Sequence, residues 1–486
     1  MTATTTTHEP VGLVVGGDRI TSSSVPHHEH IFPGTGRTNA VVAIAGASEI
    51  DRAVACAWEA HREWAGFTVD RRRDLLIGLA DVVHENLDEL AALNVHDYAV
   101  PVSFAGTAIL LERFLRHFAG YADKPLGSST PVAGSFDVNL VEREPYGVVG
   151  VIAPWNGALA VAGACVAPAL AAGNAVVFKP SELAPLASPR FGELCLEAGL
   201  PPGLVNIVPA GPEGGEALVR HPGVRKVHFT GGAHTARAVV QAAAANLTPV
   251  VAELGGKSAS IVFADADLDA AAMLSAHQGP LMQSGQSCAC ASRLVVHESV
   301  YDAFVERFLG AIDAATVGDP FDSAVTFGPV ISAAALDRIR SVIDGAVAER
   351  SGELLTGGSR IGGELSQGFF IEPTVFGDVD NSSNLAQIET FGPVVSVIRF
   401  RDDDDALRLA NDTPYGLNAF VHTRDLNRAH SVARRLEAGS VWINTFSDIS
   451  PQGPYGGYKQ SGFGRTGGID GLHEFLQIKN IRIGMG

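Results

Sequence analysis

The sequence contains little cysteine, little positive charge and no long hydrophobic run. Its five cysteines among 486 residues are too few and too scattered for the disulfide framework of a small secreted protein, which indicates a reducing compartment. The longest apolar stretches, such as residues 158–172, fall short of the ~20 residues that cross a bilayer. Lys and Arg number 35 against 53 Asp and Glu, a net charge of −18. So acidic a chain disfavours binding to nucleic acid or to a membrane surface.

The first ten residues are rich in threonine and lack the basic and apolar segments of a signal peptide. We therefore expect a frayed N-terminal tail and a cytoplasmic protein. The whole composition, 46% apolar with 54 glycines and 26 prolines, is typical of a folded chain with many turns. Its length suffices for two or more domains.

The middle of the chain alternates short β-branched runs with alanine-rich stretches. The pattern predicts strands over 148–152, 175–178, 205–208, 227–229 and 250–252, and helices over 158–172, 183–199, 213–220 and 234–246. This order predicts an open α/β sheet of parallel strands, which binds ligands at the carboxyl ends of its strands. A second α/β unit is predicted over about 259–439, with strands over 260–263 and 394–400.

Shorter signals mark individual elements. Ser48 is a candidate N-cap for a helix, and apolar residues from Leu76 to Leu90 form one amphipathic stripe. The four acids of 402–405 predict a helix start. A final strand is predicted over 476–483, and an exposed terminal strand points to a partner subunit.

Three polar residues stand where chemistry is expected. Cys288 lies in the polar, glycine-containing segment 283–288, and a thiol in such a loop is more often reactive than a buried structural one. Glu253 follows an apolar strand, where a carboxylate is either a general base or a helix-capping or salt-bridged acid. Asn156 follows another strand, and its amide either faces a developing oxyanion or closes the turn. No His or Cys pair at zinc spacing accompanies Cys288, so no metal is expected.

The glycine motifs for nucleotide binding are incomplete. Residues 255–258 end like a P-loop, but Val251 stands where that motif needs glycine. Lys179 and Glu182 follow a predicted strand and suit the hydroxyls of a ribose. A solvent-exposed helix entry is the commoner reason for such a pair.

Eight segments of the chain follow one another in the order typical of a single family. They are residues 144–150 (EPYGVVG), 154–156 (PWN), 178–182 (FKPSE), 229–231 (FTG), 253–258 (ELGGKS), 285–288 (GQSC), 389–393 (ETFGP) and 456–462 (GGYKQSG). One such motif is weak, but eight in order are specific. Together they resemble the aldehyde dehydrogenase superfamily over most of the chain.

The resemblance implies the oxidation of an aldehyde to its carboxylic acid with NAD, with NADP as the alternative cofactor. Cys288 would be the nucleophile, Asn156 and the backbone N–H of Cys288 would hold the oxyanion, and Glu253 would activate the hydrolytic water. NAD is expected over NADP because Glu182 would accept a hydrogen bond from a 2′-hydroxyl and repel a 2′-phosphate. The residues implied to hold the cofactor are Ile152, Trp155, Lys179, Glu182, Gly211, Gly215, Phe229, Gly231, Gly232, Leu254, Glu389 and Phe391.

The resemblance also implies which residues surround the aldehyde. They are Gly157, Val161, Ala164, Met282, Ser287, Ala289, Ser447 and Ile449. Gly157 and Ala164 replace positions that are often aromatic, and no arginine is among the eight. We therefore expect a bulky apolar or aromatic aldehyde rather than a dicarboxylic semialdehyde.

The implied fold is α/β, with a Rossmann-type dinucleotide-binding domain over 1–124 and 146–254 and a catalytic domain over 255–456. A small β extension over 125–145 and 470–486 would pair subunits into a homodimer or homotetramer. Two alternatives stay open. One is a coenzyme A-acylating or semialdehyde dehydrogenase of the same fold, and the other is an inactive binding protein on this scaffold.

Overall fold

The first large sheet contains the parallel strands predicted for the middle of the chain. In the computed structural model, which describes residues 10–124 and 127–485, its strand order is β19-β11-β10-β7-β8-β9-β1-β2. The five central strands are β7 (Val148–Ile152), β8 (Ala175–Lys179), β9 (Val205–Ile207), β10 (Lys226–Thr230) and β11 (Val250–Glu253). The chain runs from β7 outward through β8 to β9, then returns to place β10 and β11 on the other side of β7. Such a reversal opens a ligand crevice beyond the carboxyl ends of β7 and β10.

Short antiparallel strands complete this sheet. They are β1 (Leu13–Val15), β2 (Asp18–Ile20) and β19 (Gly462–Phe463), and β19 pairs with β11 beside Glu253. A separate hairpin joins β3 (His28–Phe32) to β4 (Arg37–Val42).

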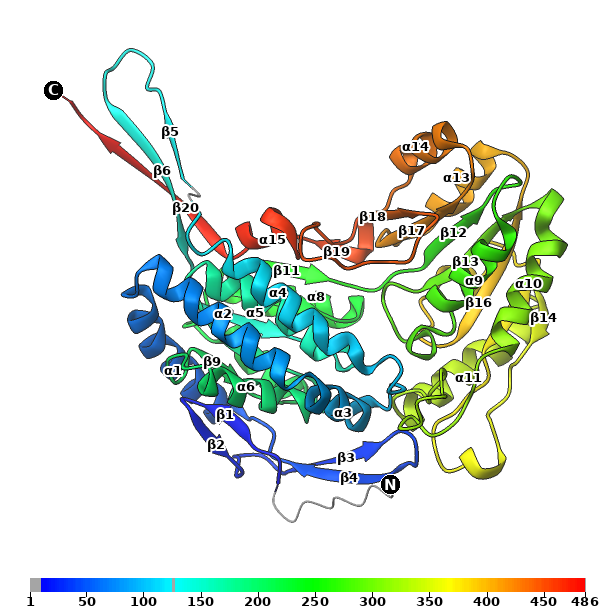
Figure 1. Ribbon diagram of the computed structural model, residues 1–486, viewed down its shortest axis with the longest axis horizontal. Helices are drawn as coiled ribbons and strands as arrows, with labels where there is room; N and C mark the ends of the chain where they lie inside the picture. Colours follow the sequence, from blue (N-terminus) through cyan, green and yellow to red (C-terminus); the bar gives the residue numbers. More distant parts are fainter. Residues whose placement is uncertain (1–9, 125–126, 486) are drawn as a thin grey trace.

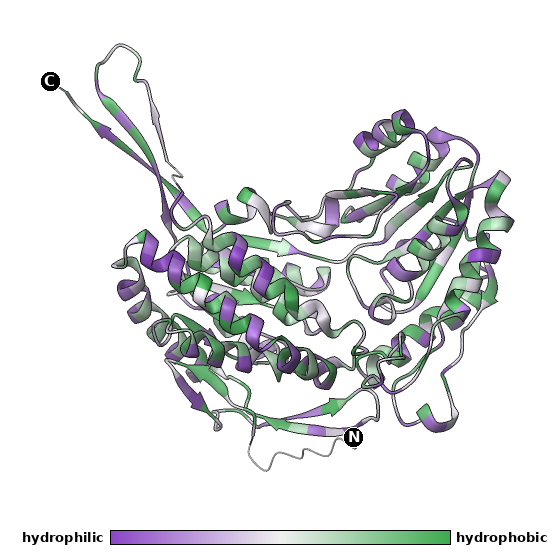
Figure 2. Ribbon diagram, in the orientation of Figure 1, coloured by the Kyte–Doolittle hydropathy of each residue, from purple (hydrophilic) through white to green (hydrophobic). Residues whose placement is uncertain are grey.

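Helices cover both faces of the first sheet (Figure 1). They are α1 (Ala47–Ala65), α2 (Val69–Glu85), α3 (Leu87–Tyr98), α4 (Ile109–Ala119), α5 (Ala158–Ala171), α6 (Ala187–Glu197), α7 (Pro212–Arg220) and α8 (Ala233–Ala243). Figure 2 shows hydrophobic residues concentrated along the strands, whereas hydrophilic residues recur on the outer helices. The sheet is therefore buried on both sides, as parallel strands require.

Two local expectations were wrong. The N-cap of α1 is Gly46 rather than Ser48, because the Glu49 carboxylate accepts a hydrogen bond from the Gly46 N–H at 2.8 Å and fixes the helix start there. The apolar stripe from Leu76 to Leu90 belongs to two helices, since Asn86 ends α2 and begins α3.

The second large sheet has the order β14-β15-β16-β13-β12-β17-β18. Its strands are β12 (Ser258–Val262), β13 (Ala291–His297), β14 (Glu353–Thr356), β15 (Thr374–Gly377), β16 (Val394–Phe400), β17 (Asn418–His422) and β18 (Ser440–Ile443). Its helices are α9 (Leu268–Gln278), α10 (Tyr301–Asp313), α11 (Ala333–Ala348), α12 (Asn384–Gln387), α13 (Asp403–Asn411) and α14 (Leu426–Arg435). The predicted acidic helix start is α13, and Asp402 caps it by accepting from the Asp405 N–H.

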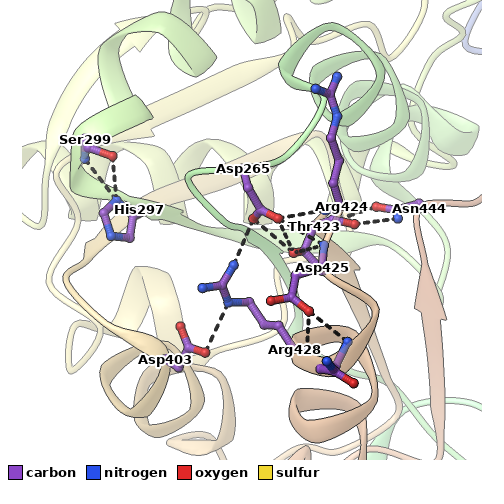
Figure 3. Close-up of polar contacts among 10 residues, drawn as sticks. Asp265, His297, Ser299, Asp403, Thr423, Arg424, Asp425, Arg428 and Asn444 are labelled. Carbon is purple, nitrogen blue, oxygen red and sulfur yellow. Dashed lines mark hydrogen bonds and ion pairs between the residues drawn. The ribbon is translucent and has the colours of Figure 1, made fainter.

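A polar network closes the carboxyl end of this sheet (Figure 3). Asp265, beyond β12, accepts hydrogen bonds from the Thr423 hydroxyl and the backbone N–H of Arg424 and Asp425. The Arg428 guanidinium adds an ion pair at 3.0 Å. Although partial burial opposes it, the hydrogen bond from Thr423 and the other donors lower the pKa of Asp265. The network therefore ties β12 to β17 and α14, and all its groups are partnered.

A three-stranded sheet projects from the body with the C-terminus at its tip (Figure 1). The predicted final strand is β20 (Leu476–Ile483), which follows α15 (Gly468–His473) and pairs along its whole length with β6 (Val138–Pro145). β5 (Ser128–Thr130) lies on the far side of β6. Parts of two expectations lie outside the described residues: residues 1–9 of the N-terminal tail, and residues 125–126 and 486 of the extension. Among the described helices, none is both long and apolar enough to cross a membrane.

Candidate active site

Two of the three predicted catalytic residues, Cys288 and Glu253, line one cavity between the two large sheets. Glu253 ends β11, Thr230 ends the neighbouring β10, and Cys288 comes from the loop that precedes β13. The cavity has a volume of about 100 Å³. It is lined by Leu110, Phe114, Ala160, Val161, Ala164, Cys165, Thr230, Glu253, Leu254, Cys288, Ile449, Tyr455 and Thr466. A thiol and a carboxylate therefore share a mostly apolar chamber.

The loop that carries Cys288 is fixed by its backbone and by one glutamine. Gln283 and Ser284 have left-handed backbones with φ of 48° and 56°. Gly285 follows with φ of 71°, and a Cβ there would collide with the Gly392 carbonyl. The Gln286 side chain accepts from the Ile331 N–H and donates to the carbonyls of residues 283 and 329. These constraints hold the sulfur in one place.

The Cys288 thiol lies in an environment that disfavours its ionised form. Burial raises its pKa to about 11, and the charges of Glu389 and Glu253 act in the same direction. A hydrogen bond with the Tyr455 side chain and the backbone N–H of Cys288 itself oppose the rise. The resting group is therefore a neutral thiol at neutral pH.

Glu253 is a buried carboxyl group without a hydrogen-bond partner among the described residues. Its exposed fraction is 5%, and neither of its oxygens has a hydrogen-bond partner among the described residues. Burial raises its pKa well above the usual value, the Glu474 charge adds to the rise, and Arg465 opposes it. The salt-bridged or helix-capping reading is wrong, because a carboxylate kept for structure would be paired.

Asn156 lies in a short 3₁₀ turn, Trp155–Gly157, directly after β7. Its Nδ2 donates to the Gln286 carbonyl at 2.8 Å. This bond anchors the amide to the loop of Cys288, two residues before the sulfur. One amide hydrogen remains free of that bond, so the group can donate to a ligand oxygen as well.

A second group of predicted residues lies beyond the carboxyl ends of β8 and β9. Lys179 Nζ lies 3.8 Å from a Glu182 carboxylate oxygen, and burial lowers the pKa of Lys179 while the Glu182 charge opposes this. Gly211 caps α7, and a Cβ there would come no closer than 4.0 Å to Glu182. A Cβ on Gly215 would lie 3.9 Å from the Lys179 side chain. The two glycines leave the first turn of α7 open opposite a lysine and a glutamate.

The crevice between β7 and β10 continues toward the second sheet. Gly232 caps α8, and no described heavy atom lies within 4 Å of the position of its Cβ. Gly231 packs against the ring of Phe229. Trp155 and Phe391 meet edge to face with centroids 5.7 Å apart. An open helix start beside an aromatic pair suits a pyrophosphate next to a flat ring.

Glu389 occupies the far end of this crevice. Its Oε1 accepts from the Gly256 N–H at 3.1 Å, and any Cβ on Gly255 would collide with its carboxylate. Burial raises the pKa of Glu389, and the Gly256 hydrogen bond opposes this. Ile152 and Leu254 are buried at the ends of β7 and β11. The predicted cofactor residues thus lie at or just beyond the carboxyl ends of the parallel strands, or beside the segment that follows β11, and their roles remain predictions.

The predicted aldehyde pocket agrees with the cavity only in part. Val161, Ala164 and Ile449 line it. Gly157, Met282, Ser287, Ala289 and Ser447 do not. Ser287 faces a separate small cavity with Glu389 and Phe391, Ala289 is buried, and Ser447 is bonded through its N–H to Gln278. Cys288 lies in a turn, closed by the hydrogen bond from the Cys290 N–H to the Ser287 carbonyl at 3.1 Å, and neither of its neighbours in sequence lines the cavity.

Sequence reasoning missed several residues of the cavity wall. Leu110 and Phe114 come from α4, Ala160 and Cys165 from α5, and Tyr455 and Thr466 from the glycine-rich segment near the C-terminus. The amphipathic pattern of α4 signalled burial but not a ligand. In the described parts of the chain, no group of three or more His, Cys, Asp or Glu side chains could hold a metal ion.

The family model for the aldehyde dehydrogenase family matches residues 20–481. The chain belongs to the aldehyde dehydrogenase family. This confirms the family, the fold class and the enzyme class expected from the sequence.

Several solved structures are similar to this aldehyde dehydrogenase. A variant of betaine aldehyde dehydrogenase from Staphylococcus aureus, in complex with NAD+ and with a BME-modified cysteine, is 35% identical, with coverage of 99% of this chain and 98% of that one and a TM-score of 0.95. PnpE in complex with nicotinamide adenine dinucleotide is 38% identical, with 97% coverage of both chains and a TM-score of 0.94. A Burkholderia cenocepacia protein assigned to the aldehyde dehydrogenases is 39% identical, with 98% coverage of both and a TM-score of 0.94.

Proposed function

We propose that this protein oxidises apolar or aromatic aldehydes to carboxylic acids with NAD, through a covalent adduct on Cys288. The observation that carries the proposal is that Cys288 and an unpartnered, buried Glu253 line the same apolar cavity. A nucleophile and a base that share one chamber suit a two-stage acyl reaction.

The first stage forms a bond between sulfur and the aldehyde carbon. The Cys288 thiol gives its proton to solvent water and the thiolate adds to the carbonyl carbon, which places a negative charge on the carbonyl oxygen. The Asn156 amide and the Cys288 N–H donate to this oxygen. The amide is already anchored beside the nucleophile by its bond to the Gln286 carbonyl.

NAD, when bound, supplies the acceptor for the hydride that leaves the tetrahedral carbon. Two features of the chain fit this cofactor. One is the open first turn of α7, which faces Lys179 and Glu182, and the other is the lack of a side chain at Gly255, which leaves room for the Glu389 carboxylate. Glu182 favours NAD over NADP, because its charge repels a 2′-phosphate. NAD is also the cofactor bound by two of the relatives.

The second stage releases the acid. Once the carbon has lost hydride, it is held to Cys288 as a thioester. Glu253 takes a proton from water, the oxygen adds to the thioester carbon, and the carbon–sulfur bond breaks to give the carboxylic acid and the thiolate. The presence of Glu253 favours water over coenzyme A as the acyl acceptor.

The cavity limits the aldehyde by size and polarity. Among the described residues that line it there is no lysine or arginine, so a second carboxylate on the substrate would be unpaired. Its volume of about 100 Å³ is smaller than that of the ~150 Å³ cavities that accept benzene, so the space limits the size of the aldehyde's tail. A compact aromatic aldehyde therefore fits better than a large terpenoid one.

An aldehyde panel tests the proposal. With NAD, we expect kcat/KM to be higher for benzaldehyde than for acetaldehyde, succinate semialdehyde or betaine aldehyde, and coenzyme A to have no effect. Cys288→Ala should abolish NADH formation while NAD binding persists. The proposal fails if that variant keeps its activity, and the substrate assignment fails if succinate semialdehyde ranks first.

A further inference from the structure

Tyr455 faces the nucleophile from the glycine-rich segment of residues 453–468. Its backbone is held by two hydrogen bonds with Thr466, of 2.7 and 2.8 Å. The next residue, Gly456, has φ of 158°, and a Cβ there would lie 2.6 Å from a Glu253 oxygen. The segment therefore has little freedom, and the phenol ring keeps its position in the wall of the cavity with Cys288.

The hydroxyl of Tyr455 is oriented by a residue of the second sheet. Asn418, at the start of β17, is 3% exposed. Its Nδ2 donates to the Tyr455 hydroxyl oxygen at 3.1 Å. The Asn418 Oδ1 has no partner among the described residues. A buried amide whose oxygen has no hydrogen-bond partner lowers the stability of the protein. We infer that the hydrogen bond from its nitrogen to Tyr455 serves function rather than stability.

The donation from Asn418 determines the direction of the next hydrogen bond. Because the phenol oxygen already accepts from Asn418, its own O–H is available for a second partner, and the Cys288 side chain lines the same cavity. Burial raises the pKa of Tyr455 well above its usual value. The phenol therefore stays protonated at any pH at which an enzyme is assayed, and it remains a donor.

We propose that Tyr455, positioned by Asn418, donates a hydrogen bond to the Cys288 sulfur and stabilises the thiolate that attacks the aldehyde. The inference rests on the proposed function only for the identity of the attacking group. It adds to that function a donor that no sequence motif indicated.

The surroundings of the sulfur make such a donor necessary. The titratable groups that face Cys288 are Glu253 from β11, Glu389 from the segment before β16, and the neighbouring thiol of Cys290. The two carboxyl groups oppose ionisation, and the largest effects on this thiol in the described residues do not come from a basic side chain. Tyr455 and the backbone N–H of Cys288 are the two donors that offset them.

The test measures thiol ionisation directly, without turnover. Alkylation of Cys288 by iodoacetamide is followed against pH, and the modified peptide is identified by mass spectrometry. Tyr455→Phe keeps the ring and removes the donor, so we expect alkylation at pH 8 to slow about tenfold and the pH profile to move up by about one unit. Asn418→Ala should shift the profile in the same direction by less, since it leaves the phenol in place but not oriented.

Two controls separate a direct effect from a general one. Tyr458→Phe changes an exposed tyrosine of the same segment and should leave the alkylation profile unchanged. Thermal melting of each variant shows whether it is folded; if Tyr455→Phe does not fold, Asn418→Ala carries the test.

The outcomes distinguish this inference from the proposed function. If Tyr455→Phe and Asn418→Ala both keep the wild-type alkylation profile, the inference is overturned. A change in KM for the aldehyde alone would show only that Tyr455 shapes the wall of the cavity. Aldehyde oxidation that survives Cys288→Ala overturns the proposed function and leaves the alkylation result standing.

Discussion

Glu253 makes the stability of the protein depend on pH in a way that a single substitution should remove. The carboxyl group is 5% exposed and neither oxygen has a hydrogen-bond partner among the described residues. Burial raises its pKa in the folded protein, whereas in the unfolded chain a glutamate titrates near ~4.3. Between these two pKa values the folded protein binds one proton more than the unfolded chain.

The sign and the size of the effect follow from that proton. The contribution of Glu253 to stability is greatest below its pKa in the unfolded chain. It is lost at about 1.4 kcal/mol per pH unit as pH rises toward its pKa in the folded protein. A rise of about 1.5 pH units inside that window thus removes about 2 kcal/mol. For a domain of about 200 residues this corresponds to a fall in Tm of roughly 4–8 °C. Glu253→Gln has no proton to lose and should be free of this contribution.

The assay compares Tm at several pH values at one scan rate for the wild type, Glu253→Gln and Glu306→Gln. Glu306 is exposed on α10, so its variant should follow the wild type. We expect the Tm of Glu253→Gln to rise relative to the wild type as pH increases. In kinetics the same variant should give a burst of NADH without steady turnover, because the thioester is not hydrolysed. Parallel Tm curves for the wild type and Glu253→Gln would refute the reasoning.

Two further substitutions test the cofactor crevice and the polar network. Gly255→Ala should displace the Glu389 carboxylate, with which a Cβ would collide, and raise KM for NAD about tenfold, the effect of one lost charge-assisted hydrogen bond. Gly310→Ala, where no described atom lies within 4 Å, is the control, and an equal KM in both variants would contradict the prediction. Asp265→Ala removes the acceptor of several hydrogen bonds and should destabilise the protein by about 2 kcal/mol in urea unfolding without changing kcat. An unchanged unfolding midpoint would show that the network contributes little.

Much of the fold could be predicted because its signals are local. Parallel strands buried on both faces appear as short β-branched runs, and the predicted strand over 148–152 coincides with β7. The start of α1 could not be predicted from the N-cap rule, since Ser48 is the better capping residue in isolation. The Glu49 side chain reaches back to Gly46 and decides the boundary, and that choice depends on the conformation of the preceding loop.

The same distinction applies to the candidate site, where some residues carry a local signal in the sequence and others depend on contacts that form only in the fold. Cys288 and Glu253 could be found because each is a reactive group in an unusual local setting, and the eight motifs in order tied them together. Tyr455 could not be found, because its role depends on a hydrogen bond from Asn418, 37 residues away. Likewise Phe114 reads as an ordinary core residue of α4, and only packing against α5 brings it to the cavity.

The two ionisable groups of the cavity act against each other, and in the proposed mechanism this conflict favours their use in succession. The charge of Glu253 raises the pKa of Cys288, and since an interaction between two charges is reciprocal, a Cys288 thiolate makes ionisation of Glu253 harder. A site with both groups charged is therefore the least stable state. While Glu253 is protonated, the thiolate forms more easily, and the Tyr455 donor assists it. After acylation the sulfur carries neither charge nor proton, so that obstacle to Glu253 is gone and the carboxylate can form when water must be activated. Acylation thus removes the repulsion that would otherwise hold back the base.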